Sequence, residues 1–469
     1  MKKLFIIILF ISKASFANDL PELGSHFDNL LTANDEKKIT FQILSQVYQS
    51  NNVINDSEIN NYIERLGSKL SMEGTDDKLS LKFFIIDDPS INAFAMLGGI
   101  IGIHTGLIFA ANTESELSSV LSHEIAHITQ KHLLRLFDSQ ARNSFKSYLA
   151  LAIAILAARS NPQVASGAIV AANAAQVQSA LDFTRENEKE ADRVGIEILN
   201  KSGFDPKGFI DFFRTLQRFN TFSSGAAPSF LRTHPITSDR ISDIQDRLKE
   251  FRYVQKESNL EFYLIKAKLQ AFLGDKELIV SIFEREINDK KSLNLEASLF
   301  GLSYAYLRKN DIFKARKTFN LIKNLDNPMF YQLEATILVN EKKYEEAYKV
   351  YKDALEKYAN NISLIIGKAN LLINSKQAHL AIEFLKKYVD LYPSNHLIYE
   401  SLAKSYSVLG KKLLEHENLA NAFYYKYDIQ EAVTQMDLAT KANDGNFYEK
   451  SRVEFRLNEL KREADLLIN

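Results

Sequence analysis

Two histidines and a glutamate lie close together in the segment 123–127, whose sequence is HEIAH. On an α-helix, side chains four positions apart project from one face, so the imidazoles of His123 and His127 can bind one metal ion. Glu124 lies about 100° from His123 around such a helix, where it can reach a zinc-bound water as a general base. The pattern predicts a zinc-dependent hydrolase.

The absence of cysteine restricts how the metal can be held. With no cysteine in 469 residues, the chain has no thiolate zinc site, iron–sulfur cluster, cysteine nucleophile or disulfide framework. A catalytic zinc ion takes three protein ligands and keeps a fourth position open for water. The third ligand must therefore be a histidine or a carboxylate.

An acidic pair further along the chain offers that ligand. Glu188 and Asp192 are four residues apart in the segment 185–192 and share one face of a predicted helix. Glu188 can bind zinc, and Asp192 can accept a hydrogen bond from the second nitrogen of a ligating imidazole. Spacing alone leaves Glu186 and Glu190 open as rival ligands, and such acidic pairs usually lie on solvated helix faces.

Two further histidines lie near these motifs. His104 belongs to a predicted strand, and we expect a structural place for it, or one at the rim of the site. His132 follows His127 by five residues, which moves it off the ligand face of a continuous helix. We expect His132 to be structural as well.

Apolar spacing predicts the elements that carry these residues. The expected elements are helices over 19–70, strands over 79–86 and 100–105, and helices over 113–252. The helix with the HEIAH segment is expected to start near Thr113, which forms a capping box with Glu116. Only 8 Pro and 17 Gly in the whole chain favour a largely helical architecture.

Self-similarity appears after about Val254. Small residues recur at Ala315, Ala347 and Ala381, with spacings of 32 and 34 residues. A period near 34 is typical of tetratricopeptide helix pairs. The step from Ala381 to Ala432 is 51 residues, which predicts one extra helix or an irregular repeat. The alternative is a generic helical bundle, because the consensus tryptophan of the repeat is absent. The partner positions, where the two helices of one repeat should touch, are Ser303, Ala335 and Ala369.

The first residues are typical of a signal peptide. Lys2 and Lys3 precede the apolar run 4–11, and Ser15 and Ala17 occupy the −3 and −1 positions of a cleavage site. We expect cleavage after Ala17, with an uncleaved anchor as the alternative. Export without cysteine suits a bacterial periplasm.

A second apolar segment, 148–175, reads as a helical hairpin broken at Asn161 and Pro162. Each arm is too short to span a membrane. The hairpin is expected either to cover the site as a lid or to touch a membrane surface.

These motifs together resemble the Ste24/HtpX-type gluzincin zinc metallopeptidases. The resemblance rests on the HEIAH segment, on the NEKEAD segment followed by Gly195, and on the segments 92–95 (NAFA) and 98–99 (GG). With a signal peptide before them and helical repeats after them, the order resembles the BepA-type (YfgC-type) periplasmic proteins of Gram-negative bacteria.

The resemblance implies roles for individual residues. It implies one Zn²⁺ per chain bound by His123, His127 and Glu188, with Glu124 as the base. Asp192 would then lie behind a ligand rather than bind the metal itself.

The resemblance also implies a switch in the segment 232–240. His234 would approach the zinc ion as a fourth ligand and hold the protease latent. Arg240 would either stabilise the developing oxyanion or anchor this loop.

A peptide substrate is expected to add to the edge of the strand 100–105 by main-chain hydrogen bonds. We expect the substrate-binding residues to include Asn92, Ala93, Gly99 and Ile101.

The expected fold class is mainly α, with an α+β gluzincin domain followed by an α-solenoid of tetratricopeptide repeats. The expected divisions are a signal peptide 1–17, a zinc metalloprotease domain 18–253, a repeat array 254–445 and a C-terminal helix 446–469. The balance of 58 Lys+Arg against 59 Asp+Glu excludes a nucleic-acid coat.

The resemblance implies a periplasmic endopeptidase that assists assembly of outer-membrane β-barrel proteins or degrades misassembled ones, with the β-barrel assembly machinery as partner. The alternatives are a non-catalytic assembly scaffold with a structural or blocked zinc site, and an exported peptidase that trims small peptides.

Overall fold

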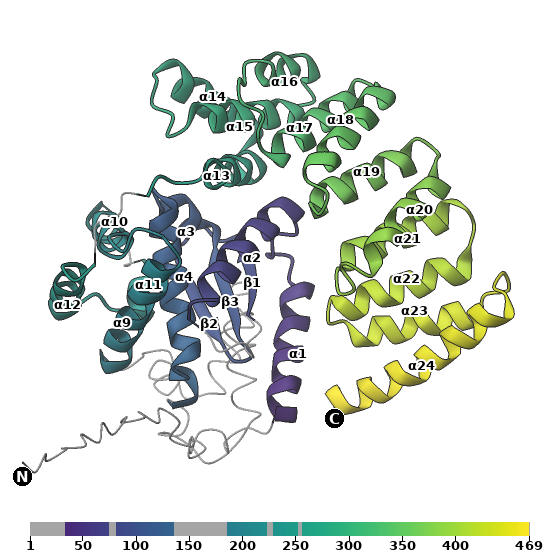
Figure 1. Ribbon diagram of the computed structural model, residues 1–469, viewed down its shortest axis with the longest axis horizontal. Helices are drawn as coiled ribbons and strands as arrows, with labels where there is room; N and C mark the ends of the chain where they lie inside the picture. The colour runs from purple at the N-terminus through teal and green to yellow at the C-terminus, as the bar shows by residue number, and fades with distance from the viewer. Residues whose placement is uncertain (1–32, 75–80, 136–184, 223–227, 252–255, 469) are drawn as a thin grey trace, which may run out of the picture.

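Helices dominate the chain, which is represented by a computed structural model. The structure describes residues 33–74, 81–135, 185–222, 228–251 and 256–468. In Figure 1 a part that contains a small sheet lies on one side, and helix pairs arc over it and return along α1. The predicted signal peptide 1–17 and the apolar hairpin 148–175 lie outside the described residues.

A three-stranded sheet lies within the first part, in the order β1-β3-β2. The strands are β1 (Lys82–Ile86), β2 (Ala93–Met96) and β3 (Ile100–His104). β1 pairs with β3 in parallel and β2 pairs with β3 antiparallel. Gly98 and Gly99 form the turn between β2 and β3 with φ of 75° and 72°, which glycine adopts without a steric penalty.

The sheet order corrects the predicted role of the strand 100–105. This strand, β3, lies in the centre of the sheet and pairs on both sides, so the prediction that it offers a free edge is wrong. The reason is β2, a strand that the sequence analysis did not predict. Among the described residues, the outer strands of the sheet are β1 and β2.

Among the described residues, no helix has the length and hydrophobicity of a membrane span. Helices cover both faces of the sheet. On one face, Ile43 and Val47 of α1 pack against Phe84. On the other, Ile63 of α2 packs in the core with Ile103, since alternate strand residues point to opposite faces. The helices of this part are α1 (Ala33–Gln49), α2 (Ser57–Ser71), α3 (Thr105–Ala110), α4 (Glu114–Thr129), α9 (Arg185–Lys201), α10 (Gly208–Phe222), α11 (Ser229–Thr233) and α12 (Ser238–Leu248).

The helix α4 starts where the sequence predicts, with half of the predicted capping box. The hydroxyl of Thr113 accepts a hydrogen bond from the backbone N–H of Glu116 at 3.1 Å. The carboxylate of Glu116 accepts instead from the backbone N–H of Asn112, also at 3.1 Å. All residues from Glu114 to His127 are buried, so α4 is packed on every side.

Residues 256–468 form successive helix pairs. The helices are α13 (Leu260–Leu273), α14 (Lys276–Asn288), α15 (Leu295–Arg308), α16 (Ile312–Phe319), α17 (Pro328–Asn340), α18 (Tyr344–Lys357), α19 (Ile362–Asn374), α20 (Ala378–Val389), α21 (His396–Val408), α22 (Lys412–Tyr425), α23 (Ile429–Lys441) and α24 (Phe447–Ile468). Both α21 and α22 lie between Ala381 and Ala432, which accounts for the long step in the repeat period.

Small residues bring the two helices of a pair together. The Ser303 hydroxyl donates to the backbone carbonyl of Ala315 at 2.7 Å, and both residues are fully buried. Ala335 and Ala347 are likewise fully buried. After α17, Lys342 adopts φ of 62°, and the backbone N–H of Lys343 donates to the Leu338 carbonyl of α17 at 2.9 Å. This helix ending turns the chain sharply. The predicted fold class, mainly helical with a small sheet and then stacked helix pairs, is confirmed.

A buried charge cluster joins the first helix pair to the sheet-containing part. The ammonium group of Lys268 in α13 lies 2.6 and 2.7 Å from the carboxylate oxygens of Asp56 and 2.5 Å from Glu58. The far end of the array returns to α1, where the rings of Phe41 and Tyr427 meet edge to face at 5.5 Å. The array therefore contacts the first part at both of its ends, as Figure 1 shows.

Replacing Lys268 by methionine is expected to lower the free energy of unfolding by about 3–5 kcal/mol, because two carboxylates are left without their cation. Denaturant titration of the full chain measures this change. The triple variant Lys268→Met/Asp56→Asn/Glu58→Gln removes the unpaired charges and keeps a capping residue at position 56, so it should recover part of the loss.

Lys323→Met, at an exposed lysine, is the matched control and should change stability by less than about 0.5 kcal/mol. An unfolding free energy of Lys268→Met equal to that of this control would show that the cluster does not stabilise the junction.

Candidate metal centre

The helix α4 presents both motif histidines to one point. The Nε2 atoms of His123 and His127 are 3.0 Å apart, and each side chain is almost fully buried. The i and i+4 positions on a regular helix produce this convergence without help from the rest of the fold.

Glu188 of α9 meets the two histidines. Its Oε2 lies 3.4 Å from His123 Nε2, and its Oε1 lies 3.4 Å from His127 Nε2. Gly195 allows α9 to come this close to α4, because a Cβ at that position would lie only 3.2 Å from the backbone of His123. Of the two rivals, Glu186 is exposed and Glu190 contacts other residues.

His234 completes a group of four possible metal ligands. It directly follows α11, is buried, and stacks on the ring of Phe230 at 4.7 Å. Its Nδ1 lies 3.0 Å from Glu188 Oε1 and 3.4 Å from His123 Nε2. The donor atoms that His123, His127, Glu188 and His234 offer all lie within 4.8 Å of one another.

The spacing of these donors fits a small four-coordinate ion. Four ligands placed tetrahedrally at zinc bond lengths lie about 3.3 Å from one another. The contacts that His123 Nε2 makes with Glu188 and His234 are both 3.4 Å. Three imidazoles and one carboxylate are suitable zinc donors, so the residues present fit the metal that the resemblance implies.

Asp192 and Arg240 form a charged layer behind the donors. Asp192 Oδ1 lies 3.1 Å from His123 Nδ1, and the guanidinium of Arg240 binds both Asp192 oxygens at 2.7 Å. Arg240 Nη1 also lies 2.8 Å from Glu188 and donates to the Pro235 carbonyl at 2.9 Å. Most donors of Arg240 are engaged in holding α9 and the loop after His234.

These contacts shift the pKa values of the buried groups. Burial opposes ionisation of Glu188, but His234 and the two motif histidines outweigh it and hold the pKa of Glu188 well below its usual range. Burial also lowers the pKa of His123, yet Asp192 and Glu188 prevail and raise it to about 9. Burial lowers the pKa of His127 well below its usual range, which favours the neutral form that binds metals.

Glu124 has a different environment from the other acidic groups. Both of its carboxylate oxygens are buried, and neither has a hydrogen-bond partner among the described residues. The backbone of Ala95 in β2 faces this carboxylate without the geometry of a hydrogen bond. His234 Nε2 lies 3.5 Å from Glu124 Oε1. Burial raises the pKa of Glu124, against the opposing effect of His234 and His123.

His132 contacts the centre, which sequence reasoning missed. Its Nδ1 lies 2.8 Å from His127 Nδ1, and its Nε2 lies 3.1 Å from Glu190, which also binds Arg135 at 2.8 Å. If His127 binds a metal through Nε2, its Nδ1–H can donate to His132, whose Nε2–H can donate to Glu190. His104 instead lies 2.8 Å from the hydroxyl of Ser90, outside the donor group, as expected for a structural residue.

The predicted substrate-binding residues lie around the sheet. Asn92 is buried, with its side-chain oxygen unpartnered among the described residues. Ala93 belongs to the outer strand β2, and Gly99 to the turn that follows it. Ile101 is fully buried in the central strand β3. Their binding role stays a prediction, and the outer edge available near Glu124 belongs to β2.

Replacing His132 by phenylalanine is expected to weaken zinc binding about 10–100-fold, because His127 loses the group that orients its ring. Competition with a chromophoric chelator measures the affinity of the full mature chain. His104→Phe is the matched control, since that histidine is also fully buried but lies outside the donor group. Equal zinc affinities of the two variants would contradict the orienting role.

The chain is similar to several known proteins. The model of peptidase family M48 matches residues 54–248. A relative in Vibrio cholerae serotype O1, provisionally named a beta-barrel assembly-enhancing protease, is 34% identical over 397 residues, which cover 84% of this chain and 82% of the relative. The beta-barrel assembly-enhancing protease of Escherichia coli (strain K12) is 28% identical over 452 residues, covering 96% of this chain and 92% of that protein. The chain belongs to peptidase family M48 and is a metalloprotease of that family.

Proposed function

We propose that this chain is a zinc-dependent endopeptidase of the periplasm that acts on misassembled outer-membrane β-barrel proteins and assists their assembly. The observation that carries the catalytic part is the carboxylate of Glu124, which is buried beside the group of four donors and accepts no hydrogen bond from the described residues. A purely structural metal site has no use for a buried carboxylate that accepts no hydrogen bond, because its desolvation lowers stability.

In this proposal, His123, His127 and Glu188 hold one zinc ion. Zinc in such a site polarises the peptide carbonyl and lowers the pKa of a bound water. Glu124 takes the proton of the attacking water, and the raised pKa makes its carboxylate a better proton acceptor than an exposed one. Asp192 orients His123, and Arg240 keeps Asp192 and Glu188 ionised and in place.

His234 is proposed as the latency switch of this centre. Its Nδ1 side faces the donors, and its Nε2 side faces Glu124. In this position it occupies the fourth ligand place and also stands beside the base, so it blocks substrate and water together. Because Arg240 binds the neighbouring Pro235 carbonyl, displacing His234 requires the loop to leave Arg240 as well.

The substrate class and location come from the relatives and from the sequence. Relatives that cover most of this chain are named for enhancing β-barrel assembly. We propose that residues 1–17 direct export, that 18–253 form the protease, and that the array 254–445 with the helix 446–469 holds substrates or the β-barrel assembly machinery. The competing function is a non-catalytic scaffold, which the fourth ligand at His234 favours.

Cleavage of casein and of an unfolded outer-membrane β-barrel protein by the full mature chain tests the proposal. His234→Ala is expected to raise the cleavage rate while one zinc ion per chain is retained, since three ligands remain. Glu124→Gln should lower the rate about 10²–10⁴-fold with zinc content unchanged.

The double variant Glu124→Gln/His234→Ala is the control, and it should be as inactive as Glu124→Gln. If wild type is inactive and His234→Ala does not relieve this, the chain is a scaffold rather than a latent protease. Undiminished cleavage by Glu124→Gln would remove the assignment of the base.

A further inference from the structure

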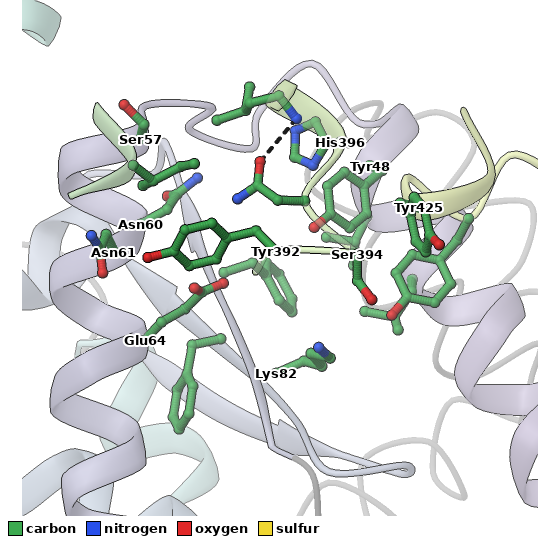
Figure 2. Close-up of a pocket in the computed structure, with 18 of the residues that line it drawn as sticks. Tyr48, Ser57, Asn60, Asn61, Glu64, Lys82, Tyr392, Ser394, His396 and Tyr425 are labelled. Carbon is green, nitrogen blue, oxygen red and sulfur yellow. Dashed lines mark hydrogen bonds between the residues drawn. The ribbon is translucent and has the colours of Figure 1, made fainter. Parts of the chain in front are cut away.

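A large cavity separates the sheet-containing part from the helical array. Its volume is about 1730 Å³, above the ~300–1,000 Å³ that small-molecule sites occupy. α1, α2 and β1 line it on one side, and the loops 358–362 and 391–397 of the array line it on the other. In Figure 2, Asn60, Asn61 and Glu64 of α2 lie at the left of the view, Tyr48 of α1 and Tyr425 of α22 lie at the right, and Lys82 of β1 lies below them. None of the four metal donors lines this cavity.

The outer edge of β1 is exposed to this cavity. The backbone of Lys82 faces β3, because its N–H donates to the Gly99 carbonyl at 2.9 Å. The backbone N–H and C=O groups of successive strand residues point to opposite sides, so those of Phe83 and Ile85 point away from β3. Phe83 lines the cavity. The carbonyl of Ile85 accepts from the backbone N–H of Ile54 at 2.9 Å.

This leaves Phe83 as an open pairing position. Its backbone N–H and C=O face away from β3, and no described residue outside the strands forms a backbone hydrogen bond with them. Unpaired groups on an outer strand are a template for another extended chain. A cavity that contains such groups therefore selects a ligand with a peptide backbone in extended form.

The residues that line the cavity indicate which side chains the ligand carries. The lining carries six tyrosines: Tyr48, Tyr358, Tyr392, Tyr424, Tyr425 and Tyr427. Tyrosine combines a large apolar face with a hydrogen-bonding tip and is typical of protein-binding surfaces. Of the asparagines in the lining, Asn361 and Asn395 cap array helices, whereas Asn60 keeps a side-chain oxygen without a partner among the described residues.

The charges of the lining nearly cancel. Four acidic residues face three basic ones in the lining, and Arg65 is paired with Glu261 at 2.5 Å. Burial raises the pKa of Glu64, although Lys82 opposes this. The cavity therefore lacks the concentrated positive charge that phosphate groups require and the single-sign field that steers charged peptides.

We propose that this cavity binds an extended, uncharged polypeptide segment with aromatic side chains, which pairs with the outer edge of β1 at Phe83. The cavity is a second binding site, separate from the outer edge of β2 beside Glu124. This proposal rests on the proposed function and extends it, because it states that a partly unfolded β-barrel protein binds here as an extended strand. Binding in this cavity does not require catalysis.

Binding is measured with the full mature chain carrying Glu124→Gln, so that a failure of catalysis does not affect the result. The probe is a fluorescein-labelled peptide of alternating tyrosine and threonine, about ten residues or roughly 33 Å when extended. Fluorescence anisotropy gives its dissociation constant. Tyr392→Ala and Tyr425→Ala should each weaken binding about fivefold or more. Tyr448→Ala, at an exposed tyrosine of α24 outside the cavity, should leave binding unchanged.

Backbone pairing is tested at Phe83 itself by amide hydrogen exchange. The bound peptide should slow exchange of the Phe83 amide roughly tenfold or more. The same peptide with alternate backbone nitrogens methylated keeps its side chains but cannot pair, and it should not protect Phe83 or bind comparably.

Three outcomes would overturn the proposal. Peptide binding with protection only in β2 would place the ligand in the catalytic cleft. Equal binding of the methylated peptide would show that no strand pairing occurs. Stronger binding of a peptide in which aspartate or lysine replaces threonine would show that the cavity selects charge.

Discussion

The buried ion pair between Arg240 and Asp192 is the contact on which the centre depends. Burying two charges lowers stability unless each is fully satisfied. Here Arg240 binds both oxygens of Asp192, contacts Glu188 and holds the Pro235 carbonyl. Arg240 therefore joins α12, α9 and the loop of His234. Asp192 in turn contacts His123 Nδ1 of α4 and fixes the orientation of its ring. Three parts of the chain that are distant in sequence, namely α4, α9 and the segment 234–248, are thereby held around one point.

The rest of the fold packs these segments against one another and buries them. α4 is buried along its length by the sheet and by neighbouring helices, and Gly195 permits the close approach of α9. The array is attached through a second charge cluster at Lys268 and through aromatic contacts at α1. Because both attachments lie on the sheet-containing part, the array encloses the cavity along β1 and leaves the metal centre separate from it.

Sequence reasoning located the local features and failed where the chain changes direction. The helix of the HEIAH segment, its start at Thr113 and the small residues of the repeats follow from periodicity. On a continuous helix, His132 would lie off the ligand face. Instead α4 ends at Thr129 and Lys131 adopts φ of 54°, which brings His132 back beside His127. The order of the strands could not be predicted from local pattern either, because β2, which places β3 in the centre, is only four residues long and is hard to recognise in the sequence.

The sequence by itself determined which metal ligands are on offer: a pair of histidines on one helical turn, a glutamate beside them, and no cysteine in the chain. That much follows from backbone geometry over four residues. Only the tertiary structure decided among Glu186, Glu188 and Glu190, brought in His234 and directed Arg240 to Asp192. These contacts span more than forty residues of sequence, and packing of whole helices, rather than local spacing, sets which side chains meet.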